Sequence, residues 1–461
     1  MKKSYLGREG WSRRLMSWVS CWLSIELFLS FVSLPLLHAE MLNTLTIHEE
    51  TALYSWLVNL QNKSPVGLLE SYPEHPSDEN VNVKNAAFTY DQALAGIVFL
   101  NRGDLVSAKK IFDFFKNQSP QNGLFSSYNN LTGAPGPMEF QKRMGPNAWV
   151  GIFALHYYAH TGDPEAYQLA RKIAVWIMSL PHIQGGVSIL LNNMAVSTEN
   201  NLSYMAFLSR LRVLASMRFS QADGDMFAQE LAGVTSFLKN YAYNPSTGLF
   251  YRGYNDFKNV LDVNSWFFLA VDALFYIQDI PGAPASVNAS HWGINIDPMI
   301  AKIESTFAVQ PDGTFGGDVL TARGFDFSDV GNASARGTPL SWIEGTNQMI
   351  VVYKMLGQGT SSQSVLYAKK ANQLLQRNAA LLINRCYKIG YPYTDLSFST
   401  QAYNDDPFFK TALGPSVATT AWVFFASRGM NPLLAPMWWN PFGALTLVEQ
   451  CCIFDHEHCG Q

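Results

Sequence analysis

Large apolar residues cover most sides of six predicted helices that recur along this chain. Residues 339–356, PLSWIEGTNQMIVVYKML, show the pattern most clearly: Ser341 and Glu344 form a capping box, and Met, Ile, Val, Tyr and Leu fill the helix body. A helix that is apolar on most sides is buried inside a larger assembly. The five comparable segments begin near Phe88, Pro146, Ser197, Leu261 and Ser416.

An amphipathic helix is predicted before each of these apolar helices. Asp, Pro and Ser are good helix openers, and charged residues at helical spacing predict one side that faces solvent. These helices begin near Ile47, Asp104, Asp163, Asp225, Asp297 and Ser364. Between the two helices of each pair, a glycine turn with a β-prone stretch predicts a small strand or hairpin. These stretches are residues 66–72, 122–128, 184–188, 247–254, 312–318 and 389–395.

Loop lengths predict how the six pairs are arranged. Links from an apolar helix to the next amphipathic one are often short, as at 101–103 and 161–162, whereas the links within a pair are long, as at 119–145. Long ordered loops are usually functional, and all six fall where the apolar helices begin. Six apolar inner helices ringed by six outer ones predict an all-α (α/α)6 barrel, or toroid. Its loops, with their short β-hairpins, would form a funnel at one end.

Composition is consistent with one large folded domain. The chain has 461 residues, of which 48% are hydrophobic and 15% are charged. This balance argues against disorder, and the repeat predicts a single barrel domain over residues 40–445. The net charge is −4 and no basic stripe is present, so nucleic acid is not expected as a partner.

The N-terminus has the pattern of a targeting segment. Basic residues precede an apolar run at 15–37, and Leu37-His38-Ala39 is a plausible cleavage site, so residues 1–39 are predicted to be a signal peptide. The run is also about long enough to span a bilayer, so an uncleaved anchor is the alternative. We expect an exported protein, periplasmic or secreted, or else one held in the membrane through this segment alone.

Five cysteines are present, and none suggests catalysis. Cys21 lies in the export segment and Cys386 near a helix end. The tail, residues 446–461, holds Cys451, Cys452 and Cys459, of which one pair could close a small loop in an oxidising compartment. The sequence leaves that pairing open.

Several common catalytic patterns are missing from the sequence. It contains no GxSxG, no phosphate-binding glycine loop and no HExxH. His156 and His160 have helical i, i+4 spacing but fall late in their helix, at the closed end, so zinc binding is not expected. We expect no metal and no cofactor.

Three segments resemble the six-hairpin glycosidase superfamily: FTYDQALAGIVFL at 88–100, STENNLSYMAFL at 197–208 and WIEGTNQM at 342–349. The resemblance covers nearly the whole predicted barrel. Members of this superfamily are (α/α)6 toroids that include glycoside hydrolases, unsaturated uronyl hydrolases, sugar epimerases and some polysaccharide lyases. The resemblance therefore implies the fold but leaves the reaction open. It also implies that the acid and the base lie where the inner helices begin.

Glu199, Glu344 and Asp91 are the predicted catalytic residues, because they stand at the starts of three inner helices. Glycoside hydrolysis needs one carboxyl to protonate the leaving oxygen and another to activate water or attack the sugar. The alternative for Glu344 is the capping box, and for Asp91 a favourable interaction with the helix dipole. The sequence does not assign acid and base, nor retention against inversion.

Substrate binding is predicted for aromatic residues that can stack on sugars and for polar residues that can bind hydroxyls. These are Tyr90, Trp149, Asn200, Asn201, Asp262, Trp266, Asp326, Trp342 and Gln348. Asp262 has a helix cap as its alternative role, Asp326 an ion pair with Arg323, and each Trp a place in the core.

The sequence thus favours an exported carbohydrate-active enzyme, a glycoside hydrolase acting on an oligo- or polysaccharide. A lyase or epimerase would place a His or Tyr beside the sugar, and the helix starts contain Tyr90 but no His. A glycan-binding envelope protein without a productive carboxylate pair is the alternative of another class. The oligomeric state is left open.

Overall fold

The computed structural model describes residues 47–73, 83–136, 140–275, 292–329, 339–383, 390–395 and 414–436. The chain divides into two compact units, residues 1–44 and 45–461, and every described residue belongs to the second. The predicted targeting segment, the tail at 446–461 and all five cysteines lie outside the described residues. None of the described helices is both long and apolar enough to cross a bilayer.

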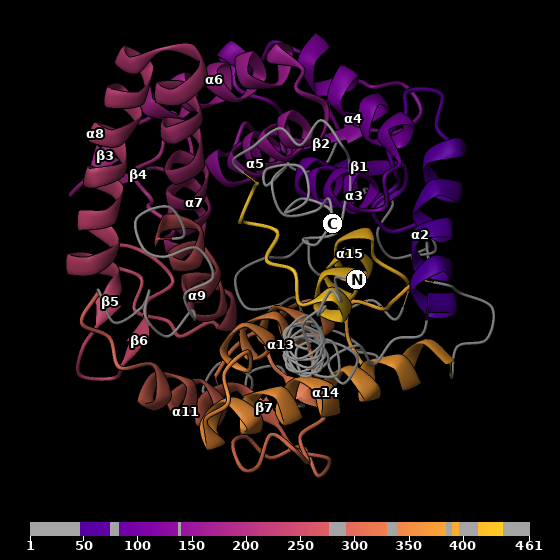
Figure 1. Ribbon diagram of the computed structural model, residues 1–461, viewed down its shortest axis with the longest axis vertical. Coiled ribbons are helices and arrows are strands. Elements are labelled where there is room, and N and C mark those ends of the chain that lie inside the picture. The colour runs from indigo at the N-terminus through magenta and orange to yellow at the C-terminus, as the bar shows by residue number, and fades with distance from the viewer. Residues whose placement is uncertain are drawn as a thin grey trace, which may run out of the picture. The chain divides into compact units, whose positions relative to one another are not determined.

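The described helices form six consecutive hairpins, each with an outer and an inner helix (Figure 1). The outer helices are α2 (Ile47–Asn62), α4 (Leu105–Asn117), α6 (Pro164–Met178), α8 (Gln221–Phe237), α11 (Ile296–Phe307) and α14 (Ser362–Ile383). The inner helices are α3 (Thr89–Asn101), α5 (Met144–Thr161), α7 (Thr198–Leu214), α9 (Leu261–Phe275), α13 (Ile343–Leu356) and α15 (Val417–Arg428). The π-helical turns η3 (Ala215–Phe219) and η4 (Leu238–Ala242) extend α7 and α8, and η2 (Pro120–Asn122) is a 3₁₀ turn.

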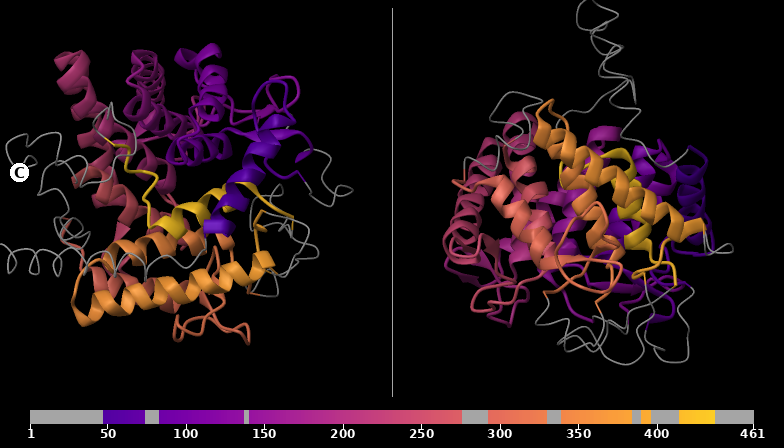
Figure 2. Two further views of the ribbon diagram at one scale, coloured as in Figure 1. Left: turned by 45° about the vertical axis from the view of Figure 1, so that its right-hand side comes forward. Right: turned by 90° about the horizontal axis from the view of Figure 1, so that it is seen from below.

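The inner helices close into a ring. Each packs against the next in the order α3, α5, α7, α9, α13, α15, and α15 packs back against α3. The outer helices surround this ring (Figure 2). Close approach needs glycine at two points, since a Cβ on Gly96 would lie 2.5 Å from the Phe153 ring and one on Gly151 would lie 2.3 Å from Phe207. The predicted (α/α)6 barrel is confirmed.

Burial separates the two kinds of helix as the apolar pattern predicted. Every residue of α13 is buried. In α4 burial is confined to Ser107, Ala108, Ile111, Phe112 and Phe115, which lie on one face of the helix. The inner helices therefore form the core, and the outer helices separate it from solvent.

The described loops contain four short two-stranded antiparallel sheets. They pair β1 (Ala86–Phe88) with β2 (Ser127–Asn129), β3 (His182–Ile183) with β4 (Gly186–Val187), β5 (Tyr243–Asn244) with β6 (Leu249–Phe250), and β7 (Ala308–Val309) with β8 (Gly324–Phe325). No strand forms in the stretch predicted at 66–72 in the first hairpin, and the strand position predicted at 312–318 is wrong for the fifth hairpin. That stretch is the loop between β7 and β8, where Phe315 makes a single bridge to Val309.

The fourth residue of each inner helix fastens the loop of its own hairpin. In α5, Asn147 Oδ1 accepts from the Leu124 N–H at 2.8 Å, and Asn147 Nδ2 donates to the Leu124 carbonyl at 2.9 Å. The six clamp residues are Gln92, Asn147, Asn201, Asn264, Thr346 and Thr420. Successive helical residues turn by about 100°, so the second residue points about 200° away from the fourth. The clamps therefore direct the second residue of each inner helix toward the ring axis.

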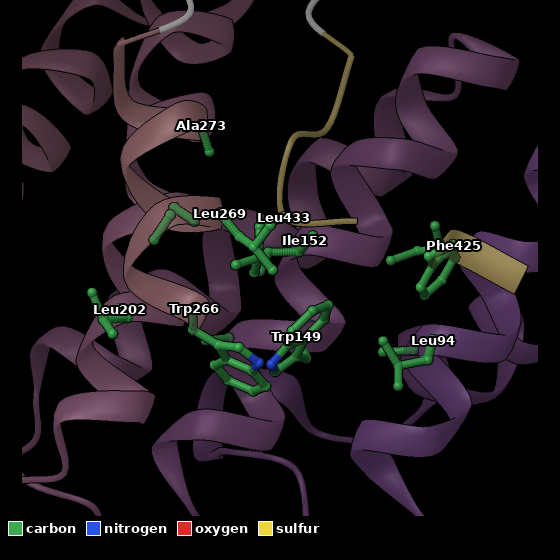
Figure 3. Close-up of a cluster of buried hydrophobic side chains, with 14 of the residues drawn as sticks. Leu94, Trp149, Ile152, Leu202, Trp266, Leu269, Ala273, Phe425 and Leu433 are labelled. Atoms are coloured by element: carbon green, nitrogen blue, oxygen red, sulfur yellow. The ribbon is translucent and has the colours of Figure 1, made fainter. Parts of the chain in front are cut away.

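A segment after α15, residues 430–436, seals the other end of the ring. Arg210 Nε donates to the Ala435 carbonyl at 2.8 Å, His156 Nε2 bonds the Pro432 carbonyl at 2.9 Å, and Asn431 Nδ2 donates to the α9 backbone. Figure 3 draws Leu433 in the same buried cluster as inner-helix residues. We call residues 430–436 the plug.

Candidate active site

A cavity of about 400 Å³ opens at the loop end of the barrel. The second residue of every inner helix lines it: Tyr90, Gly145, Glu199, Asp262, Glu344 and Ala418. Nine of the twelve predicted site residues are among its lining: Tyr90, Asp91, Trp149, Glu199, Asn200, Asp262, Trp266, Trp342 and Glu344. Four carboxyl groups from four helices thus share one cavity.

The structure places the other three predicted residues outside the lining, where each makes hydrogen bonds to other parts of the protein. Asn201 is the clamp of α7, bonding the Val187 N–H at 2.9 Å and the Val187 carbonyl at 3.0 Å. Gln348 lies one turn deeper than Glu344, and its Oε1 accepts from the Ser265 hydroxyl at 2.7 Å.

Asp326 is the third of these residues, and it holds a loop together. Its carboxylate accepts from the backbone N–H of Ser328 at 3.0 Å and of Leu340 at 3.1 Å. The alternative ion pair with Arg323 is also wrong, since Arg323 Nη1 pairs with Asp395 Oδ2 at 2.9 Å.

Glu344 occupies the most unusual electrostatic environment in the cavity. The Tyr90 hydroxyl donates to Glu344 Oε1 at 2.8 Å, and the Trp422 indole donates to the Tyr90 oxygen at 2.7 Å. The pKa of Glu344 is raised from 4.5 to about 8, chiefly by burial and also by the charges of Asp91 and Asp262, while the Tyr90 hydrogen bond opposes the shift. Glu344 is therefore largely protonated at neutral pH.

The capping box predicted at this helix is not formed. Trp342 is the cap residue of α13 and makes no side-chain cap hydrogen bond. The Ser341 hydroxyl bonds the Thr346 hydroxyl at 3.2 Å instead. Glu344 is thus not used to close the helix end.

Asp262 is a second carboxyl with a raised pKa. Burial raises its pKa from 3.8 to about 7, while the hydrogen bond from the Val263 N–H, at 2.7 Å, and the charge of Arg252 oppose the shift. Arg252 also lines the cavity and bonds Asp256 at 2.5 Å. Asp262 lies within α9, so the predicted alternative of a helix cap does not apply.

Glu199 and Asn200 enter the cavity from the start of α7. The Ser197 hydroxyl caps this helix by accepting from the Asn200 N–H at 3.3 Å. Gly145 of α5 leaves room for Asn200, because a Cβ there would lie 2.2 Å from its Oδ1. The charge of Glu199 is close enough to raise the pKa of Tyr90, which burial already holds well above its ordinary value.

Indole and phenol rings form much of the cavity wall. The Trp149 ring centroid lies 5.4 Å from that of Trp266, with edge-to-face geometry (Figure 3). The same ring lies 5.2 Å from that of Tyr90, again edge to face. Trp342 packs edge-to-face on Phe327 at 5.1 Å. Such a wall offers faces and edges for the C–H surface of a sugar.

Sequence reasoning missed several lining residues that come from the loops. These are Tyr72, Phe88, Ser126, Arg143, Ile189, Ser197, Arg252, Phe327 and Tyr393. Tyr72 and Tyr393 stand in the glycine-containing stretches of the first and last hairpins. Because these stretches are part of the repeat, the sequence could have indicated both residues. In the described lining there is no histidine, and the described residues contain no cluster of His, Cys, Asp and Glu suited to a metal ion.

Solved structures with a similar fold include two sugar epimerases and a sugar isomerase. A sugar epimerase from a ruminal bacterium aligns with a TM-score of 0.55 and 12% identity, covering 83% of this chain and 98% of that one. A cellobiose 2-epimerase from Bacillus thermoamylovorans aligns with a TM-score of 0.56 and 10% identity, covering 83% and 98%. A D-mannose isomerase aligns with a TM-score of 0.54 and 9% identity, covering 83% and 97%.

Sequence comparison gives no further assignment. No model of a protein family matches the chain, and no curated protein matches it. At such low identity the structural likeness establishes the fold alone. The chain shares the (α/α)6 barrel fold of these three solved structures.

Proposed function

We propose that this protein hydrolyses glycosidic bonds in an oligo- or polysaccharide, with Glu344 as the general acid. The observation that carries the proposal is a buried carboxyl whose pKa is raised to about 8 inside a cavity that holds three further carboxyls. An acid catalyst must keep its proton at the working pH while a partner carboxyl is ionised. Strongly perturbed pKa values in a cleft favour a catalytic site over a purely structural one.

The hydrogen bonds around Glu344 define where its proton resides. Because the Tyr90 oxygen accepts from Trp422, the Tyr90 hydrogen points to Glu344 Oε1. The acidic proton of Glu344 is therefore on Oε2. It is transferred to the glycosidic oxygen as the bond from that oxygen to the anomeric carbon breaks.

Glu199 is the partner that we assign as the base or nucleophile. It is only half-buried and projects from α7, whereas Asp91 is buried and its charge acts directly on Glu344. In this scheme Asp91 keeps Glu344 protonated. Glu199 takes the proton of the attacking water, whose oxygen bonds to the anomeric carbon, or attacks that carbon itself.

Epimerisation is the rival reaction, because similar folds belong to sugar epimerases and isomerases. That chemistry needs a group that removes a proton from carbon. Tyr90 is the candidate in the described lining, and burial raises its pKa well above its ordinary value. A phenol with so high a pKa retains its proton at neutral pH, so Tyr90 does not act as that base there.

A polysaccharide panel tests the proposal. We expect the full-length chain to release reducing ends from at least one glycan without the ultraviolet absorbance of a lyase product. E344Q and E199Q should each lower that rate by about 100-fold or more. Full turnover by both variants would contradict the proposal, and binding of glycans without cleavage would identify a binding protein.

Export is part of the same proposal. Basic residues before the apolar run at 15–37 support it. Mass spectrometry of the protein from its native host distinguishes the two forms: a chain that starts at Glu40 has lost a signal peptide, and an intact N-terminus in the membrane fraction indicates an anchor. An intact chain in the cytoplasm would contradict export.

A further inference from the structure

We infer that the indole N–H groups of Trp149 and Trp266 jointly bind one uncharged hydroxyl oxygen of the sugar that enters the cavity. The inference rests on the proposed function only in requiring that the cavity binds a sugar. Both rings line the cavity, and Figure 3 shows their nitrogen atoms on the sides that face each other. Neither Nε1 has a hydrogen-bond acceptor among the described residues, although both atoms are buried.

The position of these two residues in the repeat makes the missing acceptor notable. Trp149, Trp266 and Trp422 are each the sixth residue of an inner helix, so they lie at one depth in the ring. The Trp422 N–H is satisfied, because it donates to the Tyr90 oxygen. Among these three equivalent positions, one indole therefore donates to an acceptor in the described part of the chain and two do not.

An indole N–H can only donate, so the two groups cannot satisfy each other. A buried donor without an acceptor costs about 1–3 kcal/mol, and native proteins rarely keep such groups without a reason. A ligand atom that accepts from both would supply what the protein does not. The two donors come from α5 and α9, so the atom would lie between these helices.

The charge of the cavity selects the kind of acceptor. Asp91, Asp262 and Glu344 influence one another electrostatically, so an anion between the two indoles would be repelled by carboxyl groups. A sugar hydroxyl fits better, because its oxygen accepts from both indoles while its hydrogen is donated to a carboxylate. The deep end of the cavity is therefore specific for a neutral sugar that presents a hydroxyl there.

The test measures binding to E344Q, which separates the inference from turnover. Methyl glycosides of glucose, mannose and galactose are titrated by calorimetry, followed by the monodeoxy forms of the one bound best. We expect removal of one particular hydroxyl to weaken binding by about 10- to 100-fold. In E344Q that also carries W149F and W266F, the same removal should weaken binding by less than about threefold.

Two controls separate a lost hydrogen bond from lost packing. Replacing each Trp by β-(3-benzothienyl)alanine keeps the ring shape but substitutes sulfur for the N–H, and should give the same result as Phe. W176F removes a largely buried indole outside the described lining, and should leave the deoxy pattern unchanged.

Three outcomes would overturn the inference. The first is that removal of the hydroxyl weakens binding as much in the double Trp variant as in E344Q alone. The second is that E344Q binds no sugar. The third is that chloride competes with the sugar in E344Q but not in the Trp variants. The proposed function fails separately, if the wild type cleaves no glycan although this binding pattern is found.

Discussion

The inner helices of this barrel bury acidic groups at one end and basic groups at the other. At the loop end, Asp91, Asp262 and Glu344 lie in the first turns of inner helices. At the plugged end, Arg210 and Lys354 are buried near the ends of such helices. The helix dipole favours this sorting, because it places acids at N-termini and bases at C-termini. The two sets of charges have different surroundings, however, and that difference indicates where function lies.

Cations at the plugged end are held by backbone carbonyls. Lys354 Nζ donates to the Ser427 carbonyl at 2.7 Å, and Arg210 Nε donates to the Ala435 carbonyl at 2.8 Å. These bonds fasten neighbouring segments together. At the loop end, by contrast, Glu344 lies near two other carboxyls that raise its pKa. Several carboxyl groups buried close together destabilise the fold, and such clusters are typical of catalytic sites.

Glu344→Gln should give the largest effect on the loop end. We expect turnover to fall by about 10²- to 10⁴-fold, because the variant has no acidic proton. The pKa of Glu344 in the folded state, about 8, exceeds the ordinary 4.5, so the unfolded chain releases this proton first as pH rises. Stability therefore falls through that pH window, by at most about 1.4 kcal/mol per unit.

Gln removes this loss, so E344Q should gain stability relative to the wild type between pH 5 and pH 8. Urea unfolding at about these two pH values measures the gain. E165Q is the matched control, because Glu165 is the second residue of an outer helix and is exposed. A stability difference that does not change with pH would contradict the raised pKa.

Leu433→Ala tests the plugged end. Leu433 is fully buried among inner helices, so we expect a loss of about 2–5 kcal/mol in the free energy of unfolding. Turnover of the folded protein should be unchanged, because the cavity lies at the other end. Leu434 is only partly buried, and L434A should cost less. Equal losses of unfolding free energy in the two variants would contradict this division of roles. So would a fall in turnover under conditions in which L433A is fully folded.

Tyr90→Phe alters the link between the core and the acid. We expect turnover to fall by about 10- to 100-fold, since the variant removes the donor to Glu344 and the acceptor of Trp422. The Tyr90 hydrogen bond lowers the pKa of Glu344, so the alkaline limb of the pH–rate profile should move above about 8. Y241F, at an exposed tyrosine, is the control. A limb that stays in place would show that Tyr90 does not tune this carboxyl.

The repeat of apolar and amphipathic helices was enough to predict the ring and the end at which polar residues gather. It was not enough to predict which side of each helix start faces the cavity. A helix that is buried all round has no polar stripe to mark its faces, so Asn200 and Asn201 looked alike in sequence. Their difference comes from the loop clamps, which depend on the glycine turn of each hairpin and so become visible only in three dimensions.

Loop residues were harder to predict for a different reason. Tyr393 reaches the cavity because its segment pairs with the start of α13, through the bridge between Trp342 and Thr394. That contact joins residues that are far apart in sequence, so the spacing of hydrophobic and polar residues along the chain does not predict it. The sequence showed that aromatic residues recur after the glycine turns. It did not show which of these side chains face the cavity.

Asn200 and Asn201 allow the finest test of the comparison between scaffold and site, since they are adjacent and chemically identical. Asn201→Ala removes both clamp bonds to Val187, so we expect a loss of about 1–2 kcal/mol in the free energy of unfolding, with turnover of the folded protein kept. Asn200→Ala removes an amide that lines the cavity, so we expect unchanged stability and a KM raised by about three- to tenfold. Urea unfolding and steady-state kinetics on both variants decide the matter. If the two variants exchanged these effects, or shared them equally, the third and fourth positions of α7 would not divide binding from support as its clamp requires.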